Sequence, residues 1–525
     1  MGTLIVSALL FVLFSIGFYH GYMILTTPPL LITGGLTLLG VWDLLQIKQS
    51  IRRNYPILAH FRFLLEFIRP EIRQYFFESD MEAAPFSRNQ RSLVYQRAKA
   101  VVDKRAFGTQ RDLNLAGAEW INHSTVPKHI KNSDFRVTVG GKDCLKPYDA
   151  SIFNISAMSF GALSANAILA LNKGAKRGGF AHDTGEGSIS TYHLQHGGDL
   201  IWEIGSGYFG CRTESGRFDP VRFAEQAQLE QVKMIEIKLS QGAKPGHGGV
   251  LPASKVTQEI AITRGVPMGQ DCVSPAAHSE FSSPIELLQF VKRLRDLSGG
   301  KPVGFKLCIG HPWEWFAMCK AMLKTDILPD FIVVDGSEGG TGAAPVEFAD
   351  HVGYPLQDAL LLVHNSLVGI GLREEIRIIA SGKIISAFDI ARTCALGADM
   401  CNSARGFMFA LGCIMAQACH TGHCPTGVTT QDKHRQRALE PDNKSERVYS
   451  FHKNTLSALG ELIGAAGLTH PIQIKPYHLV RRMNDQKVAL FSEVYTFVKN
   501  GAILEGARPG PLFEQYWDAS EAESF

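Results

Sequence analysis

From residue 151 onward, the chain repeats a pattern of a short apolar segment, a turn rich in glycine or polar residues, and then a helical stretch. Strands that alternate with helices favour a parallel sheet, and eight such units in about 250 residues suit a (β/α)8 barrel. A doubly wound sheet would also alternate, but it usually carries a Gly-x-Gly-x-x-Gly turn after its first strand, and none follows residues 152–157. The predicted strands are residues 152–157, 180–184, 208–212, 234–239, 303–309, 331–335, 376–380 and 400–404.

The active site of such a barrel lies at the carboxyl ends of the strands. A phosphate site is commonly built by the loops after strands seven and eight, where backbone N–H groups converge on the anion. Gly382, Lys383 and Gly406 follow these two strands, so we expect them to bind a phosphate. The alternative is that 381–383 is an ordinary strand-to-helix turn. The other candidates in or after the predicted strands are Met158, Ser159, Glu186, Gln241, Lys244, Lys306, Gly339 and Gly340.

Lys306 stands out because it lies inside an apolar predicted strand, and an unpaired lysine is rarely buried. A cationic lysine that faces the N1/O2 side of a flavin would stabilise the anion that forms on reduction. We therefore expect Lys306 to contact a flavin. The alternative is a structural salt bridge across the barrel.

Three cysteines, Cys413, Cys419 and Cys424, are spaced C-x5-C-x4-C, and Pro425 follows the last one. Cysteine thiolates are the usual ligands of iron–sulfur clusters, and a compact run closed by Cys-Pro is typical of such sites. Three ligands without a fourth favour a [3Fe–4S] cluster, whereas structural zinc sites prefer paired C-x2–4-C units and four ligands. The alternative is three buried free thiols, which Gly422 and Pro425 disfavour because they predict a loop.

Two apolar stretches begin the chain. Residues 4–25 contain no charged side chain, and after residues 26–29 (TTPP) a second stretch covers residues 30–47, interrupted only by Asp43. Each is about long enough to cross a hydrocarbon core of roughly 30 Å, and neither a basic leader nor a cleavage site of a signal peptide is evident. The basic residues that follow place the rest of the chain in the cytoplasm by the positive-inside rule. We predict a two-span membrane anchor, with a single span or interfacial helices as alternatives.

Composition narrows the remaining choices. A formal charge of +3, without a basic block, gives no reason to expect a nucleic acid partner. Ten cysteines in 525 residues do not suggest a disulfide scaffold, so a reducing compartment is expected. We predict four regions: the membrane anchor at 1–50, a helical lead-in that packs on the barrel at 51–150, the barrel with the cysteine loop at 151–432, and a helical extension at 433–525.

Five motifs follow one another along the predicted barrel: residues 156–164 (SAMSFGALS), 184–187 (TGEG), 241–246 (QGAKPG), 339–345 (GGTGAAP), and the cysteine loop with residues 427–431 (GVTTQ). Over roughly residues 151–432 the chain closely resembles the FMN-binding synthase domain of glutamate synthases. The resemblance implies a (β/α)8 barrel with FMN beside a [3Fe–4S] cluster. It also implies a reaction that adds ammonia to 2-oxoglutarate and reduces the resulting 2-iminoglutarate to L-glutamate.

The resemblance places Lys244 and Glu186 over the flavin, at the end of the site that binds 2-oxoglutarate. A dicarboxylate needs a fixed cation, and Lys244 lies in a glycine-flanked loop where it can reach one. A carboxylate such as Glu186 can orient ammonia or stabilise the iminium, and Gln241 is a candidate polar orienter. The alternative for Glu186 is a loop carboxylate that caps the following helix.

The chain departs from the family pattern after Lys244. The typical loop continues Pro-Gly-Glu-Gly-Gly-Gln, whereas this chain has His247 and Val250 in place of the glutamate and glutamine. The specificity for 2-oxoglutarate is therefore open. A related enzyme that uses an amine in place of ammonia, as an N-methylglutamate synthase would, is one alternative. A non-catalytic electron-transfer subunit is another.

The sources of nitrogen and electrons are also expectations. The first cysteine is Cys144, so no glutaminase domain with an N-terminal cysteine nucleophile is expected, and nitrogen would come as free ammonia or from a separate glutaminase. The chain lacks a dinucleotide-binding fingerprint, so NAD(P)H would need another subunit. Ferredoxin or a quinone-linked membrane partner is the expected electron donor.

Overall fold

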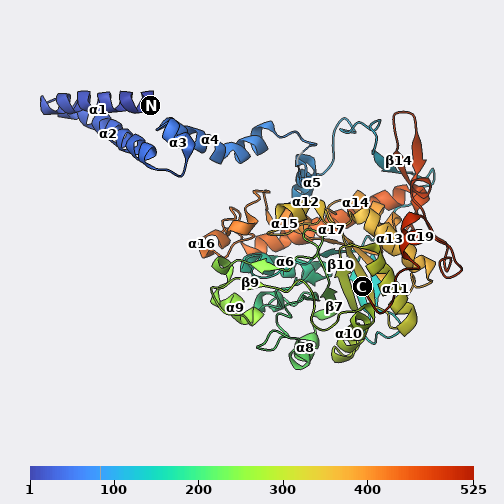
Figure 1. Cartoon of the computed structure of the whole chain (residues 1–525). Coiled ribbons are helices and arrows are strands. Elements are labelled where there is room, and N and C mark those ends of the chain that lie inside the picture. The colour runs from blue at the N-terminus through green and yellow to red at the C-terminus, as the bar shows by residue number, and fades with distance from the viewer. Residues whose placement is uncertain (83) are drawn as a thin grey trace. The chain divides into compact units, whose positions relative to one another are not determined.

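Eight parallel strands close into a barrel in the computed structural model (Figure 1), which describes residues 1–82 and 84–525. Neighbouring strands pair in the order β10-β11-β12-β13-β4-β5-β6-β7. The predicted (β/α)8 barrel is therefore confirmed. The strands are β4 (Phe153–Ile155), β5 (His182–Asp183), β6 (Leu200–Ile204), β7 (Val232–Lys238), β10 (Val303–Leu307), β11 (Phe331–Asp335), β12 (Arg377–Ser381) and β13 (Met400–Ser403).

A helix follows every barrel strand, and several begin at a side chain that accepts a backbone N–H of the first turn. Ser164 caps α6, Asp219 caps α8, Ser283 caps α10 and Ser386 caps α14, as serine and aspartate commonly do. The helices that follow the strands are α6 (Ala165–Gly178), α7 (Thr191–Leu194), α8 (Pro220–Ala227), α10 (Pro284–Leu297), α11 (Pro312–Thr325), α13 (Leu356–Gly369), α14 (Ala387–Ala395) and α15 (Arg405–Leu411).

The third strand was wrongly predicted. The chain forms β6 at Leu200–Ile204, whereas residues 208–212 belong to the loop that follows it. Tyr208 and Gly210 have φ angles of +48° and +85°, a left-handed conformation that a strand does not use. The sequence obscured β6 because Glu203 interrupts its apolar run, and this carboxylate has an ion-pair partner, Lys306, inside the barrel.

A β-hairpin covers the amino-terminal end of the barrel. It consists of β2 (Arg136–Val139) and β3 (Tyr148–Ser151), which pair antiparallel. Its apolar side chains form one buried cluster with residues from the first halves of the barrel strands, among them Met234 and Phe331. This packing leaves the opposite, carboxyl-terminal end of the barrel for a functional site.

The flanking regions are less helical than predicted. The lead-in supplies β1 (Glu119–Ile121), which pairs antiparallel with β14 (Leu479–Arg482) of the extension, and β14 pairs with β15 (Val488–Leu490). Such short strands from distant parts of the chain carry no local periodicity that a sequence could reveal. The extension also contains a long helix, α17 (Pro441–Ala465), which packs on α6, α14 and α15.

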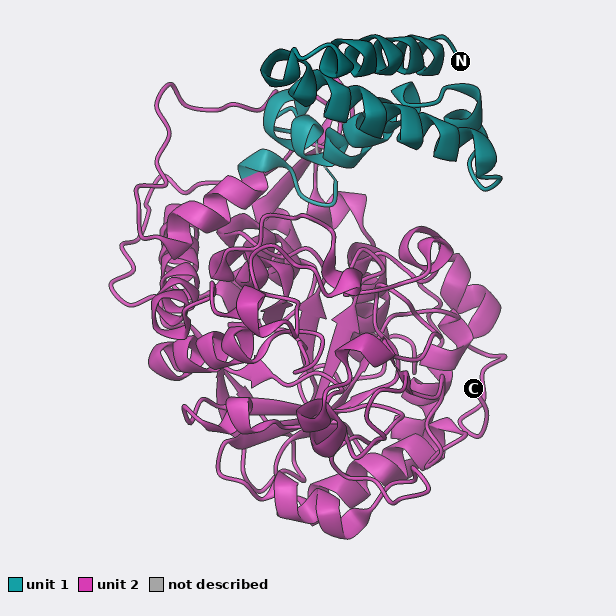
Figure 2. Cartoon of the chain, turned by 90° about the vertical axis from the view of Figure 1, so that its left-hand side faces the viewer, with its two compact units in different colours: residues 1–89 teal, residues 90–525 magenta. Residues whose placement is uncertain are grey.

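The chain divides into two compact units, Met1–Asn89 and Gln90–Phe525 (Figure 2), so the boundary lies inside the predicted lead-in. The first unit contains α1 (Gly2–Tyr19), α2 (Met23–Leu45), α3 (Ser50–Asn54), α4 (Leu58–Ile72) and the π-helix η1 (Arg73–Phe77).

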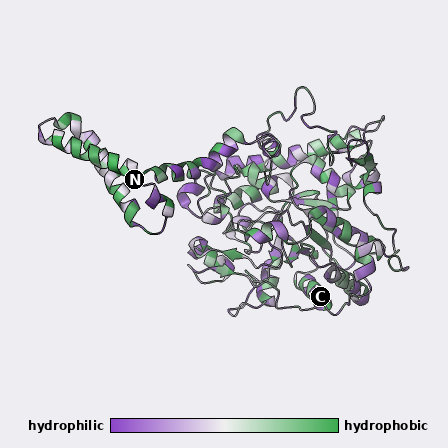
Figure 3. Cartoon of the chain, turned by 45° about the horizontal axis from the view of Figure 1, so that its top comes forward, coloured by the Kyte–Doolittle hydropathy of each residue, from purple (hydrophilic) through white to green (hydrophobic). Residues whose placement is uncertain are grey.

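Helices α1 and α2 are rich in apolar residues (Figure 3) and are long and apolar enough to cross a membrane. They pack on each other, and the Ser7 hydroxyl donates to the carbonyl of Thr33 at 3.1 Å. The break expected at residues 26–29 is wrong: the turn between the helices precedes Met23, and α2 continues through Pro28 and Pro29.

Asp330 should be a strong determinant of barrel stability. Its carboxylate accepts the Arg295 guanidinium at 2.9 and 3.0 Å and the backbone N–H groups of Gly141 and Val303. Because Arg295 and Asp330 are both buried, Asp330→Ala should leave the Arg295 charge with only the half-exposed Asp143, 4.0 Å away, and cost about 3–5 kcal/mol of unfolding free energy.

The lower stability would appear as a lower urea midpoint of the full-length protein in detergent. The matched control is Asp326→Ala, because the Asp326 carboxylate pairs with Lys142 on the surface and is 80% exposed. Such a pair contributes about 0–1 kcal/mol. Equal urea midpoints for the two variants would contradict this account.

Candidate functional site

The predicted site residues fall into two arcs at the carboxyl end of the barrel. The loops after β5, β6 and β7 carry charged side chains, whereas the loops after β11, β12, β13 and β4 carry glycines and basic residues. The strands of each arc are neighbours in the barrel. We name these the charged arc and the glycine arc.

Glu186 is the centre of the charged arc. Its Oε2 lies 3.1 Å from Nζ of Lys238, the last residue of β7, and the hydroxyl of Ser274 lies 3.4 Å from the same oxygen. Burial opposes ionisation of Glu186, but Lys238, Arg264 and Lys244 outweigh it and lower its pKa to about 2. Glu186 is therefore a carboxylate at neutral pH.

Lys244 and Arg264 give the charged arc an excess of positive charge. Lys244 is 5% exposed, and its ammonium has no hydrogen-bond partner among the residues that the structure describes. Burial lowers the pKa of Lys244, Glu186 opposes this effect, and Lys238 adds to it. The Arg264 guanidinium donates to the Ser159 hydroxyl and to the carbonyl of Phe160. Three cations thus surround one carboxylate, an arrangement suited to an anionic ligand.

The backbone of the loop after β7 reaches Glu186 only because glycine occupies position 249. A Cβ at Gly249 would lie 2.0 Å from Oε1 of Glu186. The next two residues form β8 (Val250–Leu251), which pairs antiparallel with β9 (Cys272–Val273) and so fixes the loop. Val250 is 39% exposed, and the ring of His247 contacts Phe348 edge-on. The two positions that depart from the family pattern therefore flank the segment that touches Glu186.

Gln241 lies apart from this charge cluster. Its side-chain amide donates to the Thr341 hydroxyl at 3.4 Å, which connects the loop after β7 to the loop after β11. Its expected role as a polar orienter of the substrate stays a prediction.

The glycine arc gathers two cations beside closely approaching backbone. Gly382 has a φ of +154° and Lys383 a φ of +53°, so this turn after β12 uses conformations that glycine adopts readily. Arg405, the first residue of α15, donates to the carbonyl of Glu338 at 2.7 Å. Burial lowers the pKa of Lys383, and Arg405 adds to this effect. Glu338 and Asp350 oppose this lowering, and the two cations are suited to share a phosphate.

The remaining cofactor candidates lie in the same arc. A Cβ at Gly340 would lie 2.8 Å from the Arg405 side chain, and one at Gly406 would lie 2.6 Å from the Ser403 hydroxyl. The Oδ1 atom of Asn402 is buried at the end of β13 without a hydrogen-bond partner, as expected where a polar ligand would complete the site. This set of donors fits a phosphorylated flavin. The other predicted contacts, Met158, Ser159 and Gly339, lie in the loops after β4 and β11.

Lys306 lies deeper in the barrel and has carboxylate partners. Its ammonium forms ion pairs with Glu203 and with Glu236, the latter at 2.9 Å. Burial lowers the pKa of Lys306, but these carboxylates outweigh it and raise the pKa well above its ordinary value. Burial also raises the pKa of Asp183, which faces the same cluster, and that of Glu236 to about 7. The salt-bridge alternative is therefore present, and the contact with a flavin stays a prediction.

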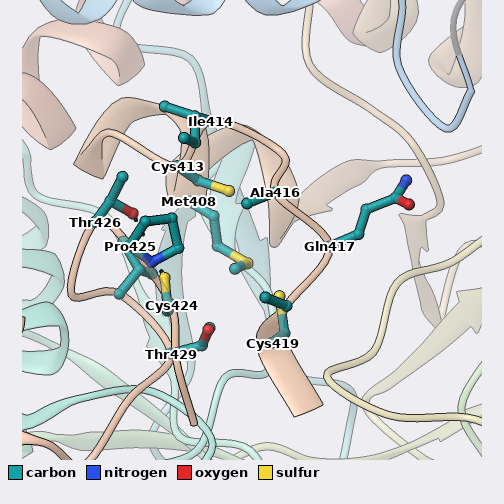
Figure 4. Close-up of a pocket in the computed structure, with 12 residues that line it drawn as sticks. Met408, Cys413, Ile414, Ala416, Gln417, Cys419, Cys424, Pro425, Thr426 and Thr429 are labelled. Atoms are coloured by element: carbon teal, nitrogen blue, oxygen red, sulfur yellow. Dashed lines mark hydrogen bonds between the residues drawn. The ribbon is translucent and has the colours of Figure 1, made fainter. Parts of the chain in front are cut away.

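The three cysteines line one pocket, and their sulfur atoms face a common space beside Met408 (Figure 4). Within residues 1–82 and 84–525, the one group of three potential metal ligands whose donor atoms all lie within 4.8 Å is Asp183, Glu203 and Glu236. At least one pair of the three cysteine sulfurs is therefore more than 4.8 Å apart. Sulfurs around one zinc ion lie about 3.8 Å apart, given a Zn–S bond of about 2.3 Å, so this pocket fits a polynuclear cluster better than zinc.

The backbone of the cysteine loop is strained and firmly held. Met415 and Gln417 have φ angles of +60° and +54°, which cost non-glycine residues energy and commonly mark functional sites. The Tyr95 hydroxyl donates to the carbonyl of Cys413 at 2.7 Å. The Gln431 amide donates to the carbonyls of Gly161 and Leu163, which attaches the cysteine loop to the loop after β4.

The cysteine thiols differ in acidity. Burial raises the pKa of Cys413 to about 12. Burial also acts on Cys424, but hydrogen bonds from Thr429 and Thr426 outweigh it and lower the pKa of Cys424 to about 7. A lowered thiol pKa favours the thiolate, which is the form that binds metal.

Three residues of these sites were missed in the sequence. Lys238 lies within the predicted fourth strand, residues 234–239, and the argument applied to Lys306, that a lysine in an apolar strand needs a partner, could have identified it. Arg264 lies within a long insertion between β7 and α10, as does Lys255, whose ammonium donates to the carbonyl of Cys419 at 2.7 Å. No local pattern marks them, because their positions depend on how the insertion folds.

Comparison with known proteins assigns the chain to a class of oxidoreductases. A family model described as "Conserved region in glutamate synthase" matches residues 129–469. The chain therefore belongs to the glutamate synthase family. It is 39% identical to the glutamate synthase large subunit-like protein YerD of Bacillus subtilis over 484 residues, which cover 84% of this chain and 92% of that protein.

Other relatives align over the barrel region. The archaeal glutamate synthase [NADPH] of Methanocaldococcus jannaschii is 39% identical over 315 residues, which cover 60% of this chain and 58% of that protein. The glutamate synthase [NADPH] large chain of Azospirillum brasilense is 32% identical over 62% of this chain, but the match covers only 22% of the large chain.

The ion pair at Glu186 should give stability a defined pH dependence. Because the folded-state pKa is depressed from its ordinary value of 4.5 to about 2, Glu186 contributes stability above about pH 4.5 that is lost as the pH falls toward 2. Lys238→Met removes the cation nearest to Glu186, so this variant should melt well below the parent protein at pH 7. The difference should narrow between pH 5 and pH 3.

Thermal melts of the full-length protein at pH 7 and pH 3 measure this difference in melting temperature. Lys324→Met is the matched control, because Lys324 is 60% exposed and pairs with Glu523 at the surface. A Lys238→Met difference that is as large at pH 3 as at pH 7 would show that Glu186 does not cause it.

Proposed function

We propose that this chain is an iron–sulfur flavoenzyme, anchored in the membrane and facing the cytoplasm, that reduces 2-iminoglutarate to L-glutamate. The observation that carries the proposal is the charged arc, in which Lys238, Lys244 and Arg264 surround the single carboxylate Glu186. The net positive charge of this arc favours binding of an anion, and a dicarboxylate would balance it.

The three cations would attract the two carboxylates of 2-oxoglutarate. Lys244 is the residue best suited to meet the substrate, since its side chain is mostly buried and its ammonium makes no hydrogen bond within the part of the chain that the structure describes. The Arg264 guanidinium already donates to the Ser159 hydroxyl, the Phe160 carbonyl and the Cys272 sulfur, so it would contribute positive charge to the site. Lys238, held by Glu186 at 3.1 Å, would contribute charge rather than a direct contact.

Glu186 would act on the nitrogen. Ammonia adds to 2-oxoglutarate with loss of water, and the protonated imine then accepts a hydride at carbon to give L-glutamate. An ionised carboxylate stabilises the iminium cation and orients ammonia before it attacks. The low pKa of Glu186 keeps the carboxylate ionised, so it would hold the iminium proton rather than supply one.

Two groups would supply the electrons. FMN, held by Met158, Ser159, Gly339, Gly340, Gly382, Lys383 and Gly406, would supply the hydride, and a [3Fe–4S] cluster on Cys413, Cys419 and Cys424 would relay electrons. Lys383 and Arg405 would neutralise the flavin phosphate. The chain has no dinucleotide fingerprint, so we propose a separate donor, either ferredoxin or a quinone-linked membrane partner. Ammonia would be free or come from a separate glutaminase.

One observation favours a second candidate. His247 and Val250 flank Gly248 and Gly249, the second of which lies against Glu186, and the family pattern has polar side chains at both flanking positions. An apolar residue at position 250 would tolerate an alkyl group on the nitrogen, so an amine such as methylamine could replace ammonia. The product would then be an N-alkylglutamate.

The first unit supports a membrane anchor. Helices α1 and α2 measure about 27 and 35 Å at 1.5 Å per residue, which matches a bilayer core of about 30 Å, and most of their side chains are exposed. Helix α4 adds exposed apolar residues such as Phe61 and Phe67 beside the basic Arg62 and Arg69. This composition suits the surface of an anionic membrane.

Turnover by substituted enzyme tests the proposed function. With the flavin photoreduced under anaerobic conditions, 2-oxoglutarate and ammonium should reoxidise it with formation of glutamate. Lys244→Met should lower kcat/KM by about 10- to 100-fold, because a hydrogen bond to a charged group contributes about 1.5–3 kcal/mol. Lys324→Met is the control and should behave like the parent protein.

The outcomes separate the candidates. Unchanged turnover in Lys244→Met would refute the assigned substrate site. Reoxidation by methylamine with 2-oxoglutarate, but not by ammonium, would support the second candidate. No reoxidation with any amine and keto acid would favour a non-catalytic electron-transfer subunit.

Deletion of residues 1–47 tests the membrane anchor. We expect the full-length protein to stay in the membrane pellet after a carbonate wash and to leave it only with detergent. The shortened protein should be released by carbonate and keep its flavin, because the barrel belongs to the separate unit Gln90–Phe525. Release of the full-length protein by carbonate would contradict the anchor.

A further inference from the structure

Lys255 joins the insertion after β7 to the cysteine loop. It ends the short 3-10 helix η2 (Ala253–Lys255), and its Nζ donates to the carbonyl of Cys419 at 2.7 Å and to the carbonyl of Thr429 at 3.3 Å. The side chain is only 5% exposed. A lysine is therefore buried against the loop that carries the three cysteines.

No carboxylate pairs with this lysine within residues 1–82 and 84–525. A buried lysine is rarely left without an anionic partner. Burial lowers the pKa of Lys255, and the acceptors of its ammonium are two carbonyls of the cysteine loop, those of Cys419 and Thr429. A cluster bound by the three cysteines as thiolates would supply the missing negative charge.

We propose that Lys255 positions the Cys419 loop and raises the reduction potential of the cluster that Cys413, Cys419 and Cys424 would hold. The inference rests on the proposed function, because it assumes that a [3Fe–4S] cluster binds there. Reduction adds one electron, and hence one negative charge, to a cluster already held by three thiolates. A buried cation nearby stabilises the reduced form more than the oxidised form.

The position of Lys255 also connects the two sites. Lys244 and Lys255 lie in one insertion, and the β8–β9 pairing holds the chain between them. The insertion after β7 therefore places Gly249 beside Glu186 and also places the Lys255 ammonium at the cysteine loop.

A redox titration of the full-length holoprotein in detergent tests the proposal. The EPR signal of the oxidised cluster is measured at each applied potential. Lys255→Met should lower the ratio of reduced to oxidised cluster about tenfold at a fixed applied potential, which for a one-electron couple corresponds to about 59 mV. Lys255→Arg keeps the charge and should titrate close to the parent protein. Lys255→Gln keeps an N–H donor without the charge and should shift like Lys255→Met.

A matched control uses another cation near the loop. The Nζ of Lys444 would lie 3.4 Å from a Cβ added at Gly412, but Lys444 is only half-buried and Glu440 acts on it. Lys444→Met should therefore shift the potential much less. Equal shifts for Lys444→Met and Lys255→Met would overturn the specific role of Lys255, as would an unshifted titration of Lys255→Met.

Failure to assemble the cluster is also informative. If both neutral variants contain flavin but no iron while Lys255→Arg contains both, the positive charge is required to hold the loop, which supports the proposal. If the parent protein shows no [3Fe–4S] signal after reconstitution, the proposed function fails and this inference fails with it. A signal in the parent with no effect of Lys255→Met would refute the inference alone.

Discussion

The ion pair between Glu186 and Lys238 organises the charged end of the barrel. It joins the loop after β5 to the end of β7, and its 3.1 Å separation keeps the carboxylate ionised in spite of burial. Lys244 and Arg264 then add positive charge that no other described carboxylate balances. The insertion after β7 can fold over this pair only because Gly249 lets its backbone approach Glu186. The charge of the site, the conformation of the insertion after β7 and the pKa of Glu186 therefore depend on one contact.

The cysteine loop is the second point at which distant segments meet. Gln431 attaches it to the loop after β4, and Lys255 attaches it to the insertion after β7. The first attachment leads to the glycine arc, which fits a phosphorylated flavin, and the second leads to the charged arc. An electron relay at the cysteines would thus border both the cofactor and the substrate ends of the barrel.

Much of this arrangement was predictable from sequence, because barrel strands and their terminal residues are local features. Seven of the eight predicted strands overlap those observed, and the residues after them fall on one end of the barrel. The prediction of the third strand was wrong because Glu203 interrupts the apolar run of β6. This buried carboxylate is explained by its ion pair with Lys306, which the sequence does not show. Lys255 and Arg264 were not predicted because they lie in a long insertion whose fold depends on contacts with Glu186 and the cysteine loop. The strands β1 and β14 escaped because each is stabilised by a distant segment.

Binding of keto acids to the oxidised holoprotein tests the central claim most directly. Isothermal titration calorimetry can compare 2-oxoglutarate with 2-oxobutyrate, which lacks the second carboxylate. The charged arc predicts that 2-oxoglutarate binds about 10- to 100-fold more tightly, because one charged hydrogen bond contributes about 1.5–3 kcal/mol. Equal dissociation constants, or tighter binding of 2-oxobutyrate, would contradict a site in which Lys238, Lys244 and Arg264 recognise a dicarboxylate.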